Sequence, residues 1–85
     1  MSDTMISEKR TADLQALVAT NIRAEMAAQE LTSAHLASLL DVRRPAALAR
    51  MRGKQGISLN ELERIADWLG VSQARLMKPR DEVAR

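Results

Sequence analysis

The 85-residue sequence contains no cysteine, phenylalanine or tyrosine, and Trp68 is its one aromatic residue. The lack of cysteine excludes disulfide bonds and thiolate metal sites, and a lone histidine, His35, cannot assemble a zinc site by itself. No apolar run approaches the roughly 20 residues that a bilayer-spanning helix requires, and the first ten residues lack the apolar core of a signal peptide. We therefore expect a cytoplasmic protein that binds no metal, no cofactor and no membrane.

The residues that are abundant favour helices over strands. Hydrophobic residues make up 46% of the chain, and alanine, leucine, glutamate and arginine are frequent. These four residue types have high helix propensity, whereas the aromatic residues that favour strands are nearly absent. A chain of this length forms one domain, which buries only about 60% of the surface of its unfolded form. We expect a compact all-α domain with a single apolar core.

Positive charge is concentrated in one segment of the chain. The formal net charge is only +2, yet residues 42–57 contain no acidic residue. The cations of this segment are Arg43, Arg44, Arg50, Arg52 and Lys54. A basic run without structural context is often no more than a solvated surface. Whether this segment binds a ligand therefore depends on the helices and loops that carry these side chains.

The first half of the chain predicts three helices. Apolar residues recur at steps of three and four residues over positions 11–29, from Leu14 to Met26, which indicates an amphipathic helix. Residues 1–10 show no such period and are expected to form a flexible N-terminal arm. A short helix is predicted over residues 33–40, and Pro45 suits the first turn of a third helix over residues 44–52.

The second half predicts a loop and two further helices. Two glycines within residues 53–56 disfavour a continuing helix. Ser58 and Glu61 then form a capping box, which begins a fourth helix that Gly70 closes. Ser72 can cap a last short helix before Pro79. We therefore divide the chain into an arm (1–10), a five-helix domain (11–78) and a flexible tail (79–85).

Two short helices joined by a tight turn, the second rich in arginine, have the organisation of a helix-turn-helix motif. Here the sequence resembles the lambda repressor and Cro-like (XRE-type) family of DNA-binding proteins over residues 14–77. The resemblance rests on Leu36 and Ala37, on the Leu40-Asp41-Val42 string, and on the segment LNELERIADWLGVS at residues 59–72. It implies a five-helix lambda-repressor-like domain with the motif in its second and third helices.

The sequence departs from the family pattern at three places. Asp41 replaces a frequent glycine at the turn, where aspartate tolerates the left-handed conformation better than most residues. Ser33 replaces a frequent glutamine and cannot read adenine as glutamine does. In the family, two apolar residues of the third helix face the core, and the corresponding residues here are Ala47 and the charged Arg50. Because a guanidinium is not easily buried, Leu48 and Met51 are alternative packing residues, which would rotate the helix by about 100°.

The resemblance implies specific contacts with double-stranded DNA. Base reading is expected from Arg43, Arg44, Ala46, Ala47 and Arg50, and phosphate contacts from Ser33, Arg52, Lys54 and Gln55. Arg44 is the first candidate for reading guanine, because its planar fork matches two acceptors on the major-groove edge of that base. The candidates for a homodimer interface are Trp68, Leu76 and Met77. A dimer would place two recognition helices about one DNA turn apart on a palindromic operator.

We therefore expect a transcriptional regulator, such as a phage Cro-like or repressor-like protein, that excludes polymerase from a promoter and binds no small-molecule ligand. The alternative is an antitoxin-like or other protein-interaction module, because one fold serves several functions. The test that separates them is whether replacing Arg44 and Arg50 by alanine abolishes DNA binding while Trp68→Ala abolishes partner binding. We do not expect an enzyme, because these residues do not compose a base, a nucleophile and an orienting group.

Overall fold

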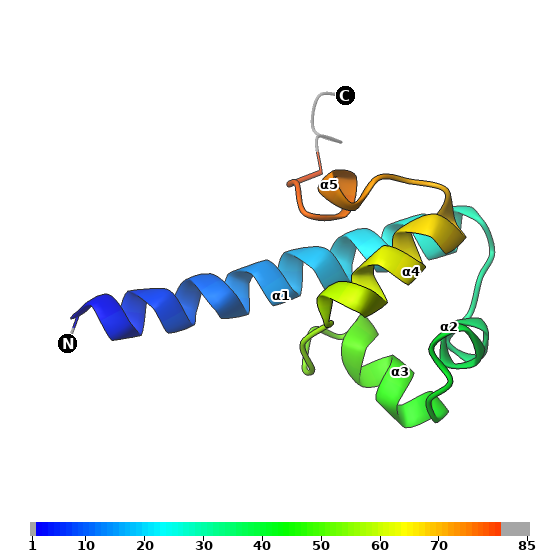
Figure 1. The fold of residues 1–85 in the computed structure, drawn as a ribbon, viewed down its shortest axis with the longest axis horizontal. Helices are drawn as coiled ribbons and strands as arrows, with labels where there is room; N and C mark the ends of the chain where they lie inside the picture. The colour runs from blue at the N-terminus through cyan, green and yellow to red at the C-terminus, as the bar shows by residue number, and fades with distance from the viewer. Residues whose placement is uncertain (1, 81–85) are drawn as a thin grey trace.

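The computed structural model describes the backbone of residues 2–80 and the side chains of residues 13–80. This part of the chain contains five helices and no strand (Figure 1). The helices are α1 (Ser2–Ala28), α2 (Ser33–Leu40), α3 (Arg44–Met51), α4 (Leu59–Leu69) and α5 (Gln73–Leu76). None of the described helices combines the length and the hydrophobicity that crossing a bilayer takes. The predicted all-α, five-helix fold is confirmed.

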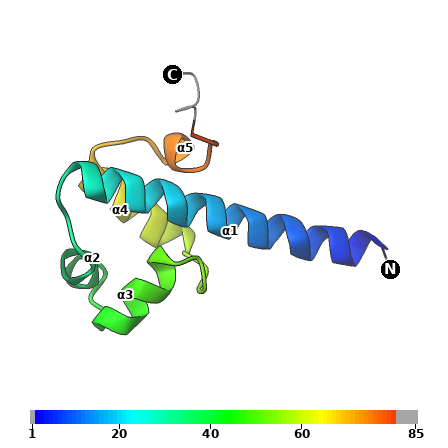
Figure 2. The ribbon, with the colours of Figure 1, turned by 180° about the vertical axis from the view of Figure 1, so that it is seen from behind.

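The first helix is longer than the sequence pattern predicts. It begins at Ser2, whereas the apolar period begins only near residue 11. Residues 2–10 lack an apolar stripe, but they also lack proline and glycine, so nothing in them interrupts a helix that is already formed. Figures 1 and 2 show that the N-terminal half of α1 extends past the other helices. Met1 of the predicted arm lies outside the described residues.

The first four helices end in the same way. Each is followed by a residue with positive φ: Glu30 (59°), Asp41 (57°), Gly53 (72°) and Gly70 (75°). The next residue then donates its amide to a carbonyl five positions back, as Val42 does to Ala37 at 3.0 Å and Val71 to Ala66 at 3.0 Å. This Schellman pattern satisfies carbonyls that would otherwise lack partners. It also turns the chain sharply, which lets short helices pack around one centre.

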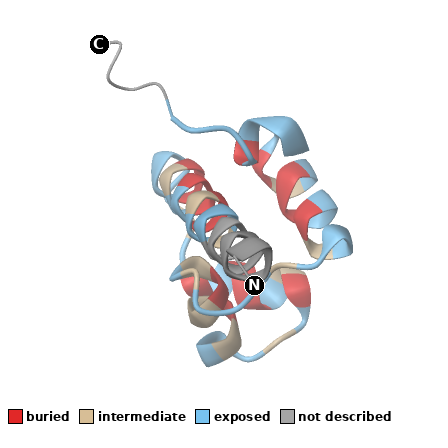
Figure 3. Ribbon diagram, turned by 90° about the vertical axis from the view of Figure 1, so that its left-hand side faces the viewer, coloured by how far each residue is buried: buried red, intermediate tan, exposed pale blue. Residues whose placement is uncertain are grey.

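The core receives apolar side chains from every helix. Val18, Ile22 and Met26 of α1 pack with residues of the other four helices, among them Leu36, Ala47, Ile65 and Leu76. Figure 3 shows buried and exposed positions alternating along the helices, as expected where each has one apolar face. Burying an aliphatic side chain of this size contributes about 1.5–3 kcal/mol. The core therefore fixes α3 at the edge of the domain, on the opposite side from α5 (Figures 1 and 2).

Polar contacts hold the chain after α5 against α1. The fully buried Asn21 donates from Nδ2 to the carbonyl oxygens of Leu76 (2.8 Å) and Lys78 (2.7 Å). Glu25 accepts a hydrogen bond from Arg75 Nε at 3.1 Å and lies 3.6 Å from Arg80 Nη1. Residue 80 of the predicted flexible tail is thus in contact with α1, and residues 81–85 lie outside the described part of the chain.

Candidate nucleic-acid interface

The α2 and α3 helices and the turn between them form the predicted motif. Ala37, which is 8% exposed, provides the small side chain expected where the two helices meet. Asp41 has the left-handed conformation that glycine takes in many family members, with φ 57° and ψ 47°. Arg43 is then the N-cap of α3 in extended conformation, and Pro45 lies in the first turn, where its missing amide hydrogen costs nothing. The turn is short, so α3 is held firmly on α2.

The inward face of α3 is formed by Ala47 and Arg50. Ala47 is 0% exposed and Arg50 is 7% exposed, while Leu48 and Met51 are only partly covered. The helix therefore keeps the family register and is not rotated. Our expectation that Ala47 and Arg50 face DNA is wrong, because both side chains are packed against the domain.

Arg50 is buried because Glu61 neutralises it. Its Nε and Nη2 atoms donate to Glu61 Oε1 (3.0 Å) and Oε2 (2.9 Å), and its Nη1 donates to the carbonyl of Ala46 at 3.0 Å. Glu61 Oε1 also accepts the amide of Ser58 at 3.2 Å, which completes the capping box of α4. This bidentate pair, which we call the Arg50–Glu61 clamp, joins α3 to α4 through strong charge-assisted hydrogen bonds.

The Arg50–Glu61 clamp also changes the pKa of Glu61. The hydrogen bonds from the Arg50 guanidinium lower the pKa of Glu61 below its ordinary value of 4.5, against the opposing effect of burial. The Ser58 amide lowers this pKa further. The folded protein therefore holds Glu61 in its charged form more strongly than the unfolded chain does.

This shift predicts a loss of stability in acid. Because the pKa of Glu61 is lowered on folding, its contribution to stability is fully present above pH 4.5 and disappears as the pH falls through the lowered value. Urea unfolding at a series of pH values should show the free energy of unfolding falling over this range. The Glu61→Gln variant keeps an acceptor for Ser58 but does not titrate, so its acid loss should be smaller. Equal losses in the two proteins would contradict the prediction.

Several arginines of the domain bind other groups of the protein, whereas most cations around α3 do not. Arg23 and Arg64 donate to the carbonyls of Met51 and Leu39, and Arg50, Arg75 and Arg80 pair with glutamates. The side chains of Arg43, Arg52 and Lys54 are exposed and make no hydrogen bond or ion pair with another described residue. The positive charge available to a ligand on this side of the domain therefore surrounds α3.

Arg44 is exposed and is held by Ser33. Arg44 Nε donates to Ser33 Oγ at 2.9 Å, which leaves the two outer nitrogens of the guanidinium without a partner among the described residues. Ser33 itself is 7% exposed. Our expectation that Ser33 contacts phosphate is wrong, because its hydroxyl is covered and bound to Arg44. It orients the guanidinium instead.

The α3–α4 loop (residues 52–58) holds Lys54 and Gln55 close to α1. A Cβ at Gly53 would lie 3.3 Å from Ala16 Cα, a tight contact, and the φ of 72° also favours glycine, so the loop passes close to the α1 backbone. The amides of Lys54 and Gln55 both donate to the carbonyl of Ala49, at 2.9 and 3.3 Å. Their side chains are exposed and are available to a ligand.

The three candidates for a dimer interface lie in different environments. Trp68 is half-buried and packs against the core margin. Leu76 is 0% exposed, so our expectation that it lies in a dimer interface is wrong: it is a core residue. Met77 is 42% exposed and lies beside two exposed leucines, Leu14 (43%) and Leu59 (79%). Leu59 is the first residue of α4, at the edge of the apolar stripe that Leu62, Ile65, Ala66 and Leu69 form on this helix.

The described residues contain no group of three or more histidine, cysteine or acidic side chains that could hold a metal ion. Among the solved structures that resemble this one are those of two bacterial proteins. A hypothetical transcription factor, NHTF from Neisseria, has a TM-score of 0.74 and 30% sequence identity, and the match covers 84% of this chain and 80% of that chain. The restriction-modification controller protein C.AhdI from Aeromonas hydrophila has a TM-score of 0.65 and 22% identity, with 73% and 94% covered, which shows a shared fold. No protein-family model and no curated protein matches the sequence.

Proposed function

Because this chain belongs to the lambda repressor/Cro-like (XRE-type) family of helix-turn-helix proteins, we propose that it is a sequence-specific regulator of transcription that binds double-stranded DNA. The observation that carries the proposal is the exposed set of cations around α3, of which Arg44 is oriented by Ser33. The name of the Neisseria protein, a hypothetical transcription factor, supports the same function. Such a protein acts in the cytoplasm, at the nucleoid.

The exposed residues divide into base readers and phosphate contacts. Arg43 and Arg44 lie at the start of α3, the end that meets base edges when a recognition helix enters the major groove. Ala46 is partly exposed and offers a methyl group, which suits contact with the methyl group of thymine. Arg52, Lys54 and Gln55 lie at the other end of α3 and in the loop, where they suit phosphate.

The regulatory part of the proposal is simple repression by a dimer. A Cro-like or repressor-like protein of this kind occupies a palindromic operator and excludes polymerase, and the half-sites lie about one DNA turn apart. The described residues form one domain around one core. We assign regulation to protein concentration, dimerisation or degradation. We assign the chain no catalytic activity and no small-molecule effector.

The test is selection of bound duplexes from a random pool, followed by a salt titration on the selected sequence. We expect half-sites that contain guanine next to thymine, because Arg44 and Ala46 suit these two bases. If about four to six phosphates per subunit are neutralised, the logarithm of the binding constant falls with the logarithm of salt concentration with a slope of roughly −4 to −5 per subunit. A pool without enrichment, or a flat salt response, would reject the function.

A further inference from the structure

The side chains of α3 lack the oxygen atoms that accept hydrogen bonds. Residues 42–54 contain no aspartate, glutamate, asparagine, glutamine, serine or threonine, and no histidine either. The charged side chains of this segment are arginines and one lysine, which donate hydrogen bonds and do not accept them. The other side chains are apolar. The outward face of α3 can therefore donate hydrogen bonds or make apolar contacts.

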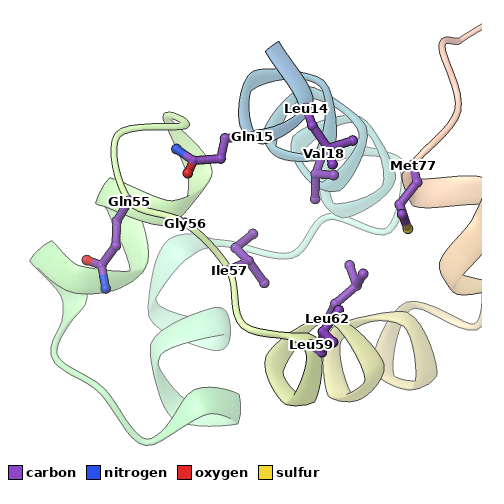
Figure 4. Close-up of a pocket in the computed structure, with 9 residues that line it drawn as sticks. All are labelled: Leu14, Gln15, Val18, Gln55, Gly56, Ile57, Leu59, Leu62 and Met77. Carbon is purple, nitrogen blue, oxygen red and sulfur yellow. The ribbon is translucent and has the colours of Figure 1, made fainter. Parts of the chain in front are cut away.

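The nearest side-chain acceptors lie outside this face. Ser33 Oγ accepts the Nε atom of Arg44 at 2.9 Å, and this serine is 7% exposed. Gln55 lies on the α3–α4 loop, among the residues that line a recess between this loop and α1 (Figure 4). Asp41 is in the turn that closes α2, before the first residue of α3. Direct reading by α3 therefore has to work without a side-chain acceptor.

This composition limits which base edges α3 reads in the major groove. Adenine is read through its amino group and N7 by asparagine or glutamine, and the amino group of cytosine is read by aspartate or glutamate. None of these four residue types occurs in α3. The features that remain are the two acceptors of guanine, which match arginine, and the 5-methyl group of a pyrimidine, which alanine can contact.

Two alanines provide the apolar part of this face. Ala46 and Ala49 are three residues apart, so they are neighbours on the surface of α3. Both are partly exposed, whereas Ala47 between them is 0% exposed. Ala49 lies about 200° from Ala47 around the helix axis, on the side away from the core. These two methyl groups are therefore open to contact from a base edge.

Alanine distinguishes pyrimidines by their methyl group alone. Thymine and 5-methylcytosine both carry a methyl group at C5, and they differ at C4, where thymine has an acceptor oxygen and cytosine a donor amino group. Because an alanine side chain ends at Cβ, it has no polar group with which to recognise the C4 substituent. Methylation of cytosine at C5 therefore supplies the same contact that thymine supplies.

We propose that α3 recognises a 5-methylpyrimidine beside the guanine read by Arg44, and that 5-methylcytosine serves there as thymine does. Ala46 and Ala49 contact the methyl group, so methylation of cytosine at C5 strengthens binding at this position. The proposal rests on the proposed function, because it concerns the bases that the recognition helix reads. It makes binding responsive to a chemical modification of the operator, with no ligand bound to the protein.

The first test changes only the DNA. Each thymine of the selected duplex is replaced in turn by deoxyuridine, which keeps the base pair and removes the methyl group. We expect binding to weaken about fourfold at one or more positions beside the guanine, which is equivalent to about 0.8 kcal/mol for one buried methyl-sized group. At the same position, 5-methylcytosine should bind about fourfold more tightly than unmethylated cytosine. Fluorescence anisotropy gives both ratios of dissociation constants.

The second test changes the protein. Glycine lacks Cβ, so in Ala46→Gly or in Ala49→Gly both ratios should fall towards one. Ala74→Gly is the matched control, because Ala74 is exposed on α5, on the opposite side of the domain from α3 (Figures 1 and 2). This variant should keep both ratios at their wild-type values. A single glycine weakens a helix only moderately, and thermal unfolding shows whether each variant is folded.

The outcomes separate this proposal from the proposed function. A selected duplex whose thymines can all be replaced by deoxyuridine without loss would overturn the reading of the methyl group and leave sequence-specific binding intact. Weaker binding to 5-methylcytosine than to cytosine would overturn it as well, and so would wild-type ratios in folded Ala46→Gly and Ala49→Gly. A random pool without any enriched sequence would reject the proposed function, and this proposal with it.

Discussion

Replacement of Arg44 by alanine is expected to weaken binding to the selected duplex by about 1–3 kcal/mol, or roughly 5- to 150-fold, and to relax the preference for guanine at one position. The reason is the geometry of this side chain. Ser33 holds Nε at 2.9 Å, so the outer fork of the guanidinium is oriented before DNA arrives. A preoriented donor pair loses less conformational entropy on binding than a free arginine does.

Three further variants separate base reading from general attraction to DNA. Lys54→Ala removes one exposed cation near phosphate, so it should weaken all sequences about equally and reduce the salt slope by about one. Arg44→Lys keeps the charge but lacks the planar fork, so it should not restore the guanine preference. Ser33→Ala should act in the same direction as Arg44→Ala with a smaller effect. Binding measured by fluorescence anisotropy on matched and mismatched duplexes checks each case, and an equal loss on all sequences for Arg44→Ala would contradict its base-reading role.

The second large effect is expected from Arg50→Ala, which should lower the free energy of unfolding by about 2–4 kcal/mol. The side chain is 9% exposed, and its removal breaks three hydrogen bonds and leaves the charge of Glu61 largely buried without its partner. For a domain of this size the melting temperature should fall by roughly 8–30 °C. Thermal and urea unfolding followed by circular dichroism measure both quantities.

A double-mutant cycle with Glu61→Gln isolates the clamp. Glu61→Gln removes the charge but keeps an acceptor for Ser58, and Arg50→Met keeps most of the apolar stem. The two changes together should cost less than the sum of the two separate changes, because the second removes the charge that the first leaves unpaired. If Arg50→Ala instead keeps its melting temperature and loses sequence preference, Arg50 reads bases and the clamp has no structural role.

Local signals in the sequence predicted much of the fold. Ser58 and Glu61 located the start of α4, and the bond from the Glu61 amide to Ser58 Oγ at 3.1 Å is present. Asp41 was expected to take the left-handed conformation, and it does. In both cases the interacting groups lie within a few residues of each other, so their spacing in the chain determines whether they meet.

The side-chain environment of the candidate site depended on contacts between helices, which spacing does not reveal. Arg50 is buried because Glu61, on another helix, lies opposite it, although an arginine alone predicts exposure. Ser33 is buried, and its hydroxyl accepts a hydrogen bond from Arg44 on the next helix. Leu59 shares the apolar character of the α4 stripe, but no other described element covers it. Leu76 is buried because α5 folds back onto α1, where Asn21 binds the Leu76 carbonyl.

The clamp between Arg50 and Glu61 has a consequence for how such a protein acquires new targets. The side chains that aim α3 are different from those that face outward at positions 43, 44 and 46. Changes at these three positions leave the Arg50–Glu61 clamp intact, so we expect them to alter which DNA sequence is preferred while α3 stays joined to α4. The domain is therefore a suitable starting point for retargeting, whether by natural divergence or by selection from a library randomised at these three positions.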